Sequence, residues 1–304
     1  MNKPIFEGSA VAIVTPFTSE GGVNFKKLEQ LVDFHLQNGT DAIVVCGSTG
    51  EASTMPDDEH IATIKCVVDA VNHKVPVIAG TGSNDTAHGI RLTKRACEVG
   101  ADAALIVTPY YNKCTPEGLY RHFKTMAENC DVPVVLYNVP SRTNVNISPD
   151  VLYRLAEVEN IKAIKECNLS QVPEILSACG DRYDFYSGED ALVVPLLSMG
   201  GKGVISVVAN LLPSKMSQMV HAYLDGDLKT ARDIQIEVIP LVKAMFCEVN
   251  PIPVKEAVDY VGFKTGECRL PLCGMSEKNR QFMIDTLSKY DLSHIDSFLK
   301  GVAD

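Results

Sequence analysis

Short apolar runs alternate with amphipathic segments along most of the chain. The runs are rich in β-branched residues and are apolar nearly throughout, as expected for strands covered on both faces. They span residues 10–14, 42–46, 76–80, 103–108, 133–138, 161–166, 183–187 and 203–207. Between them, apolar residues recur at helical spacing, as in segments 25–35 and 61–71. Successive runs start roughly twenty to thirty-five residues apart, the length of one βα unit, so the pattern predicts a closed parallel (β/α)8 TIM barrel.

The end of the chain has a different pattern. After about Leu211 no further strand is indicated, whereas helical spacing continues through residues 227–248, 253–261 and 276–289. We therefore expect a catalytic barrel in residues 1–225 and a C-terminal helical region in residues 226–304.

Turn residues fit the same arrangement. Gly39 and Gly100 each follow an amphipathic segment and precede a strand, where a left-handed residue is favoured at the end of a helix. Ser148 and Pro149 are typical of the start of a helix. The apolar stretch 191–212 contains several glycines, so it predicts a buried helix followed by a strand rather than a membrane span.

Composition narrows the class of protein. The chain of 304 residues has 28 Lys and Arg against 38 Asp and Glu, a net charge of −10, which argues against nucleic acid or an anionic membrane as a partner. The ten cysteines are scattered without a C-x-x-C pair, which indicates free thiols in a reducing compartment. The first residues lack the apolar run of a signal peptide, so we expect a soluble, cytoplasmic protein.

Lys165 is the first candidate for chemistry, because reacting groups in such barrels lie at the C-terminal ends of strands. It comes near the end of the sixth predicted strand, on the same face as Ala163 and Ile161 by strict alternation. If that face points into the barrel, burial lowers the pKa of the amine, and a neutral amine attacks ketones to form a Schiff base. A lysine that extends to solvent from a strand end fits the same pattern.

Polar residues follow two other strands. Tyr137 ends the fifth strand at the height of Lys165, where its hydroxyl would transfer protons, and Arg142 follows in a loop, where its planar guanidinium suits a carboxylate. Ser48 and Thr49 lie between glycines after the second strand, in a turn that presents N–H groups and hydroxyls. A packed aromatic ring, a solvated loop charge and an ordinary glycine turn are the alternatives.

Other chemistries have little support in the sequence. The seven histidines show no metal-binding spacing, the dinucleotide-binding glycine pattern is incomplete, and no P-loop occurs. Tyr110 and Tyr111 are adjacent in the loop after the fourth strand, and one ring has to find cover elsewhere, for which a partner subunit is a candidate.

Five motifs at successive strand ends and beyond them point to a family. GSTGE, TPYYN, LYNVPSRT, AIKEC and NPIPVK together resemble the dihydrodipicolinate synthases of the pyruvate-dependent class I lyase superfamily, from about Gly8 to Pro271. The resemblance implies that Lys165 forms a Schiff base with pyruvate and that Tyr137 donates and accepts protons. It also implies a proton relay of Thr49, Tyr137 and Tyr111, with Tyr111 supplied by the neighbouring subunit of a tight dimer.

The resemblance extends to the substrates. It implies that Arg142 holds the carboxylate of L-aspartate 4-semialdehyde and that Gly188 and Ile205 line the pyruvate pocket. The product would be 4-hydroxy-tetrahydrodipicolinate, on the diaminopimelate route to lysine, without a metal or organic cofactor. The family often assembles as a dimer of dimers, which predicts a homo-oligomer.

Two alternatives remain at this point. Ser48 stands where the synthases more often have threonine, and the similar N-acetylneuraminate lyases favour serine there, so a pyruvate lyase acting on a sugar acid is the second hypothesis. Arg142 argues against it, because the sialic acid lyases lack an arginine in that loop. A barrel without activity that binds a small acid is the third hypothesis. The joint presence of five candidate residues argues against it: Lys165, Tyr137, Thr49, Tyr111 and Arg142.

Overall fold

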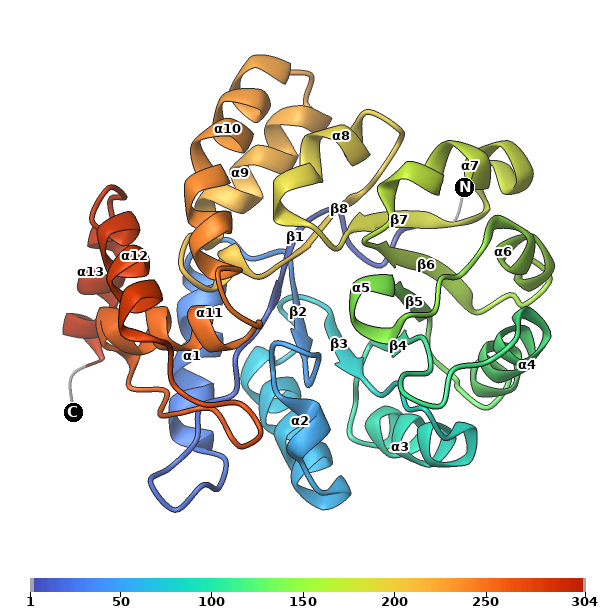
Figure 1. Cartoon of the computed structure of the whole chain (residues 1–304), viewed down its shortest axis with the longest axis horizontal. Coiled ribbons are helices and arrows are strands. Elements are labelled where there is room, and N and C mark those ends of the chain that lie inside the picture. The colour runs from blue at the N-terminus through green and yellow to red at the C-terminus, as the bar shows by residue number, and fades with distance from the viewer. Residues whose placement is uncertain (1–2, 303–304) are drawn as a thin grey trace.

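The protein is a closed barrel of eight parallel strands surrounded by helices, which confirms the predicted fold. The computed structural model describes residues 3–302. Neighbouring strands pair in chain order, and β1 closes the barrel against β8. Figure 1 shows the ring of helices around the barrel, with the C-terminal helices gathered at one side.

The observed elements follow the predicted order. The strands are β1 Gly8–Ala12, β2 Ala42–Val45, β3 Val77–Gly80, β4 Ala103–Val107, β5 Val134–Asn138, β6 Ile161–Glu166, β7 Asp184–Ser187 and β8 Gly203–Ser206. The helices of the barrel are α1 Phe25–Gln37, α2 Asp57–Val71, α3 Thr86–Glu98, α4 Pro116–Ala127, α5 Pro140–Thr143, α6 Pro149–Leu155, α7 Val172–Cys179, α8 Val193–Leu197 and α9 Pro213–Leu224.

The first strand differs from its prediction, since it begins and ends two residues earlier than the expected 10–14. Ile13 and Val14 are fully buried, but the Val14 N–H donates to the Asn210 side chain at 3.1 Å instead of continuing the ladder. An apolar pattern indicates which residues are buried, and it therefore could not locate the residue at which β1 stops pairing with its neighbouring strands.

The predicted face of Ile161 is wrong. Val134 of β5 pairs with Ile161 and the next residue, Val135, pairs with Ala163, so the register shifts by one residue at the start of β6. Such an irregularity interrupts the alternation of side chains. Ala163 consequently packs inside the barrel with Val135, whereas Ile161 packs among the residues under the helices.

Packing separates the interior of the barrel from the layer beneath the helices. The interior cluster is made of strand residues that are often small, among them Ala10, Ala12 and Ala103. Phe6 stacks on Tyr186 at 4.2 Å, and the Tyr186 hydroxyl donates to the Phe6 carbonyl at 2.8 Å. Phe6 precedes β1, so this pair covers the barrel on the side where the strands begin.

Four helices form the C-terminal part of the described chain: α10 Leu228–Met245, α11 Ile252–Val258, α12 Glu277–Leu287 and α13 Ser293–Gly301. The first three match the predicted segments, and α13 was not predicted because nine residues give only a short periodic pattern. Phe34 of α1 lies edge-on to Phe263 and to Phe298 of α13, which joins this region to the barrel. The proposed division at residue 225 stays a prediction.

The predictions about local turns are confirmed. Gly39 and Gly100 have φ of 74° and 96°, and the Ser148 side chain accepts from the Val151 N–H at the start of α6.

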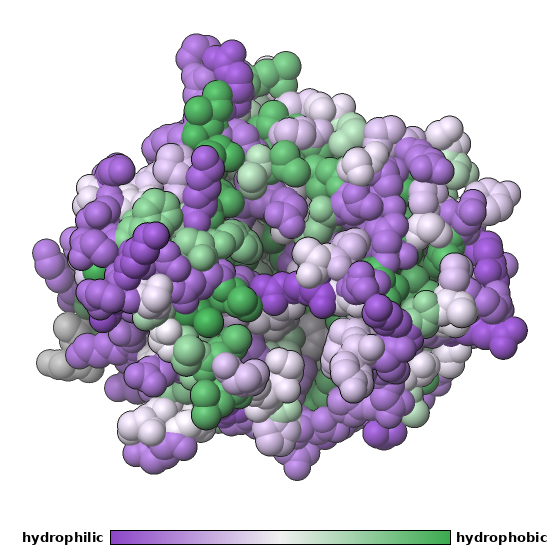
Figure 2. Space-filling model, viewed as in Figure 1, coloured by the Kyte–Doolittle hydropathy of each residue, from purple (hydrophilic) through white to green (hydrophobic). Residues whose placement is uncertain are grey.

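The ten cysteines, all within the described residues, are free thiols. Among the helices of residues 3–302, none combines the length and the apolar character needed to span a bilayer. Figure 2 shows hydrophilic residues over much of one face, with a hollow near its centre.

Candidate active site

Lys165 lies inside the barrel near the end of β6. Its Cα is in register with Tyr137 of β5 and Tyr186 of β7, and its side chain is 6% exposed. Its Nζ lies 4.3 Å from the centre of the Tyr137 ring. Burial lowers the pKa of this amine from its ordinary value of 10.5, since the ammonium form loses its hydration. The structure therefore places a desolvated amine at the C-terminal end of the strands.

Tyr137 is buried beside this amine. Its side chain is 8% exposed, and burial raises the pKa of its phenol well above the ordinary range. The phenol therefore keeps its proton at neutral pH and is able to donate it to a nearby oxygen. The Cys167 thiol neighbours the hydroxyl and adds to this effect on the pKa.

Gly188 and Ile205 border the same space. Gly188 directly follows β7, and its N–H donates to the Glu166 carbonyl at 2.8 Å. A Cβ at Gly188 would overlap Cys167 Sγ, so a larger residue would displace that side chain, and it would contact Lys165 Cε at 3.4 Å. Ile205 of β8 is 1% exposed and belongs to the interior cluster with Tyr137. Gly188 thus lies next to Lys165, and Ile205 lies in the interior cluster that contains Tyr137.

Glu166 follows Lys165 but points to the other face of β6, as alternation requires. Its carboxylate accepts from Asn138 Nδ2 at 2.7 Å, from the Asn168 N–H at 2.6 Å and from Gln171 Nε2 at 2.9 Å. Burial raises its pKa to about 7 despite these donors. Because its oxygens accept from the end of β5 and from the segment after β6, Glu166 anchors the end of the strand that carries Lys165.

The turn after β2 presents one hydroxyl to the interior and one to the surface. Thr49 is 4% exposed, whereas Ser48 is exposed. Cys46 and Glu51 on either side have φ of 54° and 57°, a left-handed conformation that is costly for residues other than glycine. Thr49 Oγ1 accepts a hydrogen bond from Asn250 Nδ2 at 3.0 Å. The local backbone and a distant side chain together hold the Thr49 hydroxyl in a buried position.

A buried ion pair lies behind this turn. Lys255 of α11 donates to Glu51 Oε1 at 2.7 Å, and both side chains are 1% exposed. Lys255 also donates to the Glu267 carbonyl at 3.0 Å and lies 3.8 Å from the centre of the Phe17 ring. The pair connects the end of the Thr49 turn to the C-terminal helices.

Arg142 lies on the short helix α5 after β5, with an exposed side chain. Its guanidinium donates to the Asn250 carbonyl at 2.9 Å. Burial is the main cause of the lowered pKa of Lys165, and the positive charge of Arg142 lowers it further. The same charge offsets part of the rise that burial causes in the pKa of Tyr137. Arg142 is therefore close enough to act on the buried cluster while remaining open to a ligand.

Tyr111 does not join this cluster within one chain. It lies on the loop after β4 with a φ of 70°, and its side chain is 93% exposed. The structure brings together Lys165, Tyr137 and Gly188, with Thr49 and Arg142 linked through Asn250, and leaves Tyr111 at the surface.

Three polar groups near the cluster were not predicted. Asp190 is fully buried and accepts from the Val207 and Val208 N–H groups at 3.0 and 3.1 Å, while its Oδ1 has no partner among the described residues. The negative charges of Asp190 and Glu189 partly counteract the lowering of the Lys165 pKa by burial. Their position directly after Gly188 was the available signal. Asn250, the third group, lies in a motif noted above only for its resemblance.

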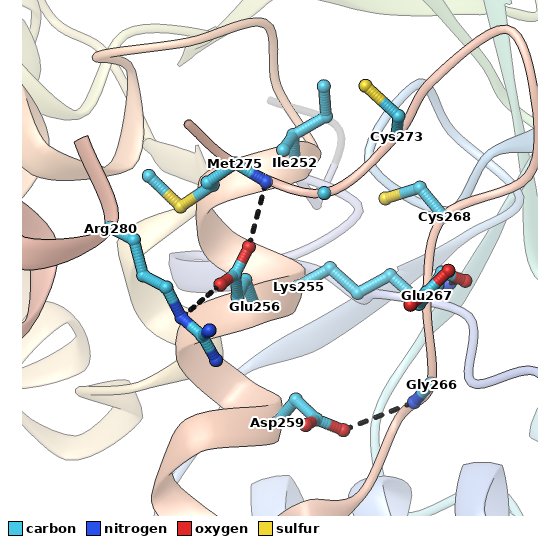
Figure 3. A pocket seen from close by; sticks show the side chains of 11 residues that line it. Ile252, Lys255, Glu256, Asp259, Gly266, Glu267, Cys268, Cys273, Met275 and Arg280 are labelled. Atoms are coloured by element: carbon cyan, nitrogen blue, oxygen red, sulfur yellow. Dashed lines mark hydrogen bonds and ion pairs between the residues drawn. The ribbon is translucent and has the colours of Figure 1, made fainter. Parts of the chain in front are cut away.

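A cavity lies in the C-terminal part of the chain, and none of the predicted site residues lines it. It has a volume of about 280 Å³ and lies between α11 and the loop leading to α12, lined by Glu256, Asp259 and Arg280 among others (Figure 3). Glu256 pairs with Arg280 at 2.6 Å, and Asp259 accepts from the Gly266 N–H at 3.2 Å. These charged groups already have partners, so we assign no ligand to this cavity.

Comparisons with known proteins agree with the geometry. The sequence model of the dihydrodipicolinate synthetase family matches residues 5–290. A 4-hydroxy-tetrahydrodipicolinate synthase of Acetivibrio thermocellus is 58% identical over 96% of this chain and 100% of that protein.

Solved structures of dihydrodipicolinate synthases are also similar to this chain. A dihydrodipicolinate synthase from Aquifex aeolicus is 46% identical, with a TM-score of 0.92 over 94% of this chain and 99% of that chain. A dihydrodipicolinate synthase from Acinetobacter baumannii in complex with pyruvate is 43% identical, with a TM-score of 0.91 over 94% and 99% of the two chains.

Proposed function

The chain belongs to the dihydrodipicolinate synthetase family. We propose that its buried Lys165 condenses with pyruvate and that the resulting enamine attacks the aldehyde of L-aspartate 4-semialdehyde. The enzyme is a lyase, and its reaction is that of a 4-hydroxy-tetrahydrodipicolinate synthase. The observation that carries the residue assignment is the Lys165 amine, which is desolvated and lies 4.3 Å from the centre of the Tyr137 ring.

The first half of the proposed reaction forms a carbon nucleophile. The neutral Lys165 amine attacks the ketone carbon of pyruvate to give a carbinolamine, whose hydroxyl takes up a proton and leaves as water, so that a protonated imine remains. This imine withdraws electrons from the methyl group, so a methyl proton passes to the hydroxyl relay and a neutral enamine forms. The carboxylates of Glu189 and Asp190 favour the positive imine over a neutral amine.

Proton transfer falls to hydroxyl groups. We assign to Tyr137 the donation and removal of protons at the carbinolamine oxygen, because its phenol is buried and protonated. Thr49 connects Tyr137 to a relay completed by Tyr111 from a second copy of the chain. The 93% exposure of Tyr111 leaves it free for that partner. Ser48, exposed beside Thr49, supplies a further hydroxyl at the rim.

The second half joins the two substrates. The enamine carbon attacks the aldehyde carbon of L-aspartate 4-semialdehyde, whose carboxylate binds Arg142. The substrate amino group then attacks the imine carbon, releases Lys165 and closes the six-membered ring. One water is lost overall, and no step needs a metal or an organic cofactor. Gly188 and Ile205 border the space that pyruvate occupies in this scheme.

The sugar-acid lyase hypothesis is the weaker one. The relatives that match along nearly the whole chain are named 4-hydroxy-tetrahydrodipicolinate synthases, and Arg142 offers a guanidinium for the second substrate's carboxylate. The proposal includes a homo-oligomer, with a tight dimer as its unit and a tetramer built from two dimers, and a cytoplasmic location.

Borohydride reduction tests the central assignment. With pyruvate present, reduction is expected to add a lactyl-type mass to the peptide that contains Lys165, and the Lys165→Arg variant should lose both the adduct and the activity. Lys162 is the internal control, because it lies on the same strand but near its opposite end. An unmodified Lys165, or a label on Lys162, would contradict the proposal.

A further inference from the structure

Asn250 contacts both sides of the candidate site although the proposed reaction gives it no step. It lies in the loop between α10 and α11, 201 residues from Thr49 and 108 from Arg142 in the chain. Its side chain is 6% exposed. The side-chain Nδ2 donates to Thr49 Oγ1 at 3.0 Å, and the backbone carbonyl accepts from Arg142 at 2.9 Å.

The contact with Thr49 determines where the hydroxyl proton points. A threonine hydroxyl has one proton and two lone pairs. Because the Asn250 amide occupies one lone pair, the proton of Thr49 is directed away from Asn250 and remains available to another acceptor. The reverse orientation of the amide would place an acceptor against Oγ1 and draw the proton toward Asn250.

The oxygen of the same amide faces no donor among the described residues. Asn250 Oδ1 is buried and has no hydrogen-bond partner among the described residues. Buried acceptors without partners are uncommon and costly. Among the described residues, the side chain therefore forms its hydrogen bond through Nδ2, to Thr49.

We propose that Asn250 is a positioning residue, whose side chain sets the proton direction of Thr49 and whose backbone carbonyl orients Arg142 toward the second substrate. The C-terminal helical region thereby forms part of the site, since the loop before α11 joins the hydroxyl that serves the keto acid to the guanidinium that serves the aldehyde. The inference rests on the proposed function.

The side chain can be tested apart from the carbonyl. Asn250→Ala removes the donor but keeps the carbonyl that binds Arg142, so kcat is expected to fall by about threefold to tenfold with little change in KM for L-aspartate 4-semialdehyde. Asn250→Asp has nearly the same shape but places an acceptor against Thr49. It should therefore be less active than Asn250→Ala, whereas a purely structural role predicts the opposite order.

A double-mutant comparison identifies the group through which Asn250 acts. In a Thr49→Val background, Asn250→Ala is expected to change kcat by less than about twofold, because the hydroxyl it orients is gone. The matched control is Asn160→Ala. Asn160 is a half-buried asparagine whose Nδ2 donates to the Ala127 and Cys130 carbonyls at 2.7 and 2.9 Å, before β6 begins. This variant should lower Tm while leaving kcat within about twofold.

Three results would overturn the role of Asn250: a kcat of Asn250→Ala within twofold of the unsubstituted chain, additive losses with Thr49→Val, or Asn250→Asp more active than Asn250→Ala. If Asn250→Ala does not fold, a near-normal kcat of the isosteric Asn250→Asp variant overturns it equally. A failure of the unsubstituted chain to form the Lys165 adduct would instead refute the proposed function, so the two failures are distinguishable.

Discussion

Replacing Lys255 by methionine is expected to destabilise the protein strongly, since it leaves a buried carboxylate without its partner. Lys255→Met keeps the length of the side chain but removes the ammonium that contacts Glu51 at 2.7 Å, with both side chains 1% exposed. It also removes the donor to the Glu267 carbonyl and the cation above the Phe17 ring. Breaking one side of a buried ion pair costs about 3–5 kcal/mol.

Thermal unfolding measures this loss. For a chain of this length, each kcal/mol lowers Tm by about 2 °C, so a fall of about 6–10 °C is expected. The variants are compared at one protein concentration, because the Tm of an oligomer depends on concentration. Lys65→Met is the matched control, since Lys65 contacts Asp69 at the same 2.7 Å but the two side chains are 56% and 60% exposed. Its loss should stay below about 1 kcal/mol.

The double variant Glu51→Gln with Lys255→Met examines the cause. A neutral amide at position 51 still accepts the Arg269 N–H, which lies 2.8 Å from the carboxylate now. The double variant is therefore expected to be no less stable than Lys255→Met alone, because the uncompensated charge is gone. Losses that simply add, or a fall in Tm below about 2 °C for Lys255→Met, would refute this account of the pair.

Three further predictions concern ionisation and oxidation. Adduct formation with pyruvate should decline as pH falls through the pKa of Lys165, with a midpoint below 10.5, because only the neutral amine attacks; a midpoint at or above that value would contradict the burial argument. In Arg142→Ala this midpoint should move to higher pH, since a positive charge that lowers the lysine pKa is removed, and activity at low L-aspartate 4-semialdehyde should fall at least tenfold. The thiol oxidant diamide should join Cys97 to Cys130 first, because their sulfurs are 4.0 Å apart and their hydrogen bond lowers the pKa of Cys97. Cys66 should react slowly, since its pKa is raised to about 11. Peptide mapping that finds another disulfide first would contradict this prediction.

Most of the barrel could be predicted because the apolar pattern of each segment indicates whether that segment forms a strand or a helix. A strand buried on both faces has to be apolar over consecutive residues, and a covering helix has to be apolar at every third or fourth position. These rules located β2 to β8 within one residue at either end, and they located the helices α1 and α2. They failed at Ile13 and Val14, which are buried but do not belong to the paired strand β1. They also failed at Ile161, because the register shift at the start of β6 places its side chain on the other face.

For the site, the local pattern of the chain was enough to show which residues lie at the carboxyl ends of the strands. Lys165 and Tyr137 are in register because β5 and β6 are neighbours, and chain order makes neighbours in a barrel of this kind. The side chains that surround Lys165 and Tyr137 could be identified only from the folded chain. Asn250 reaches Thr49 across 201 residues and Lys255 reaches Glu51 across 204. Periodicity describes how one segment meets its own surroundings, and contacts between segments so far apart depend on the path of the whole chain.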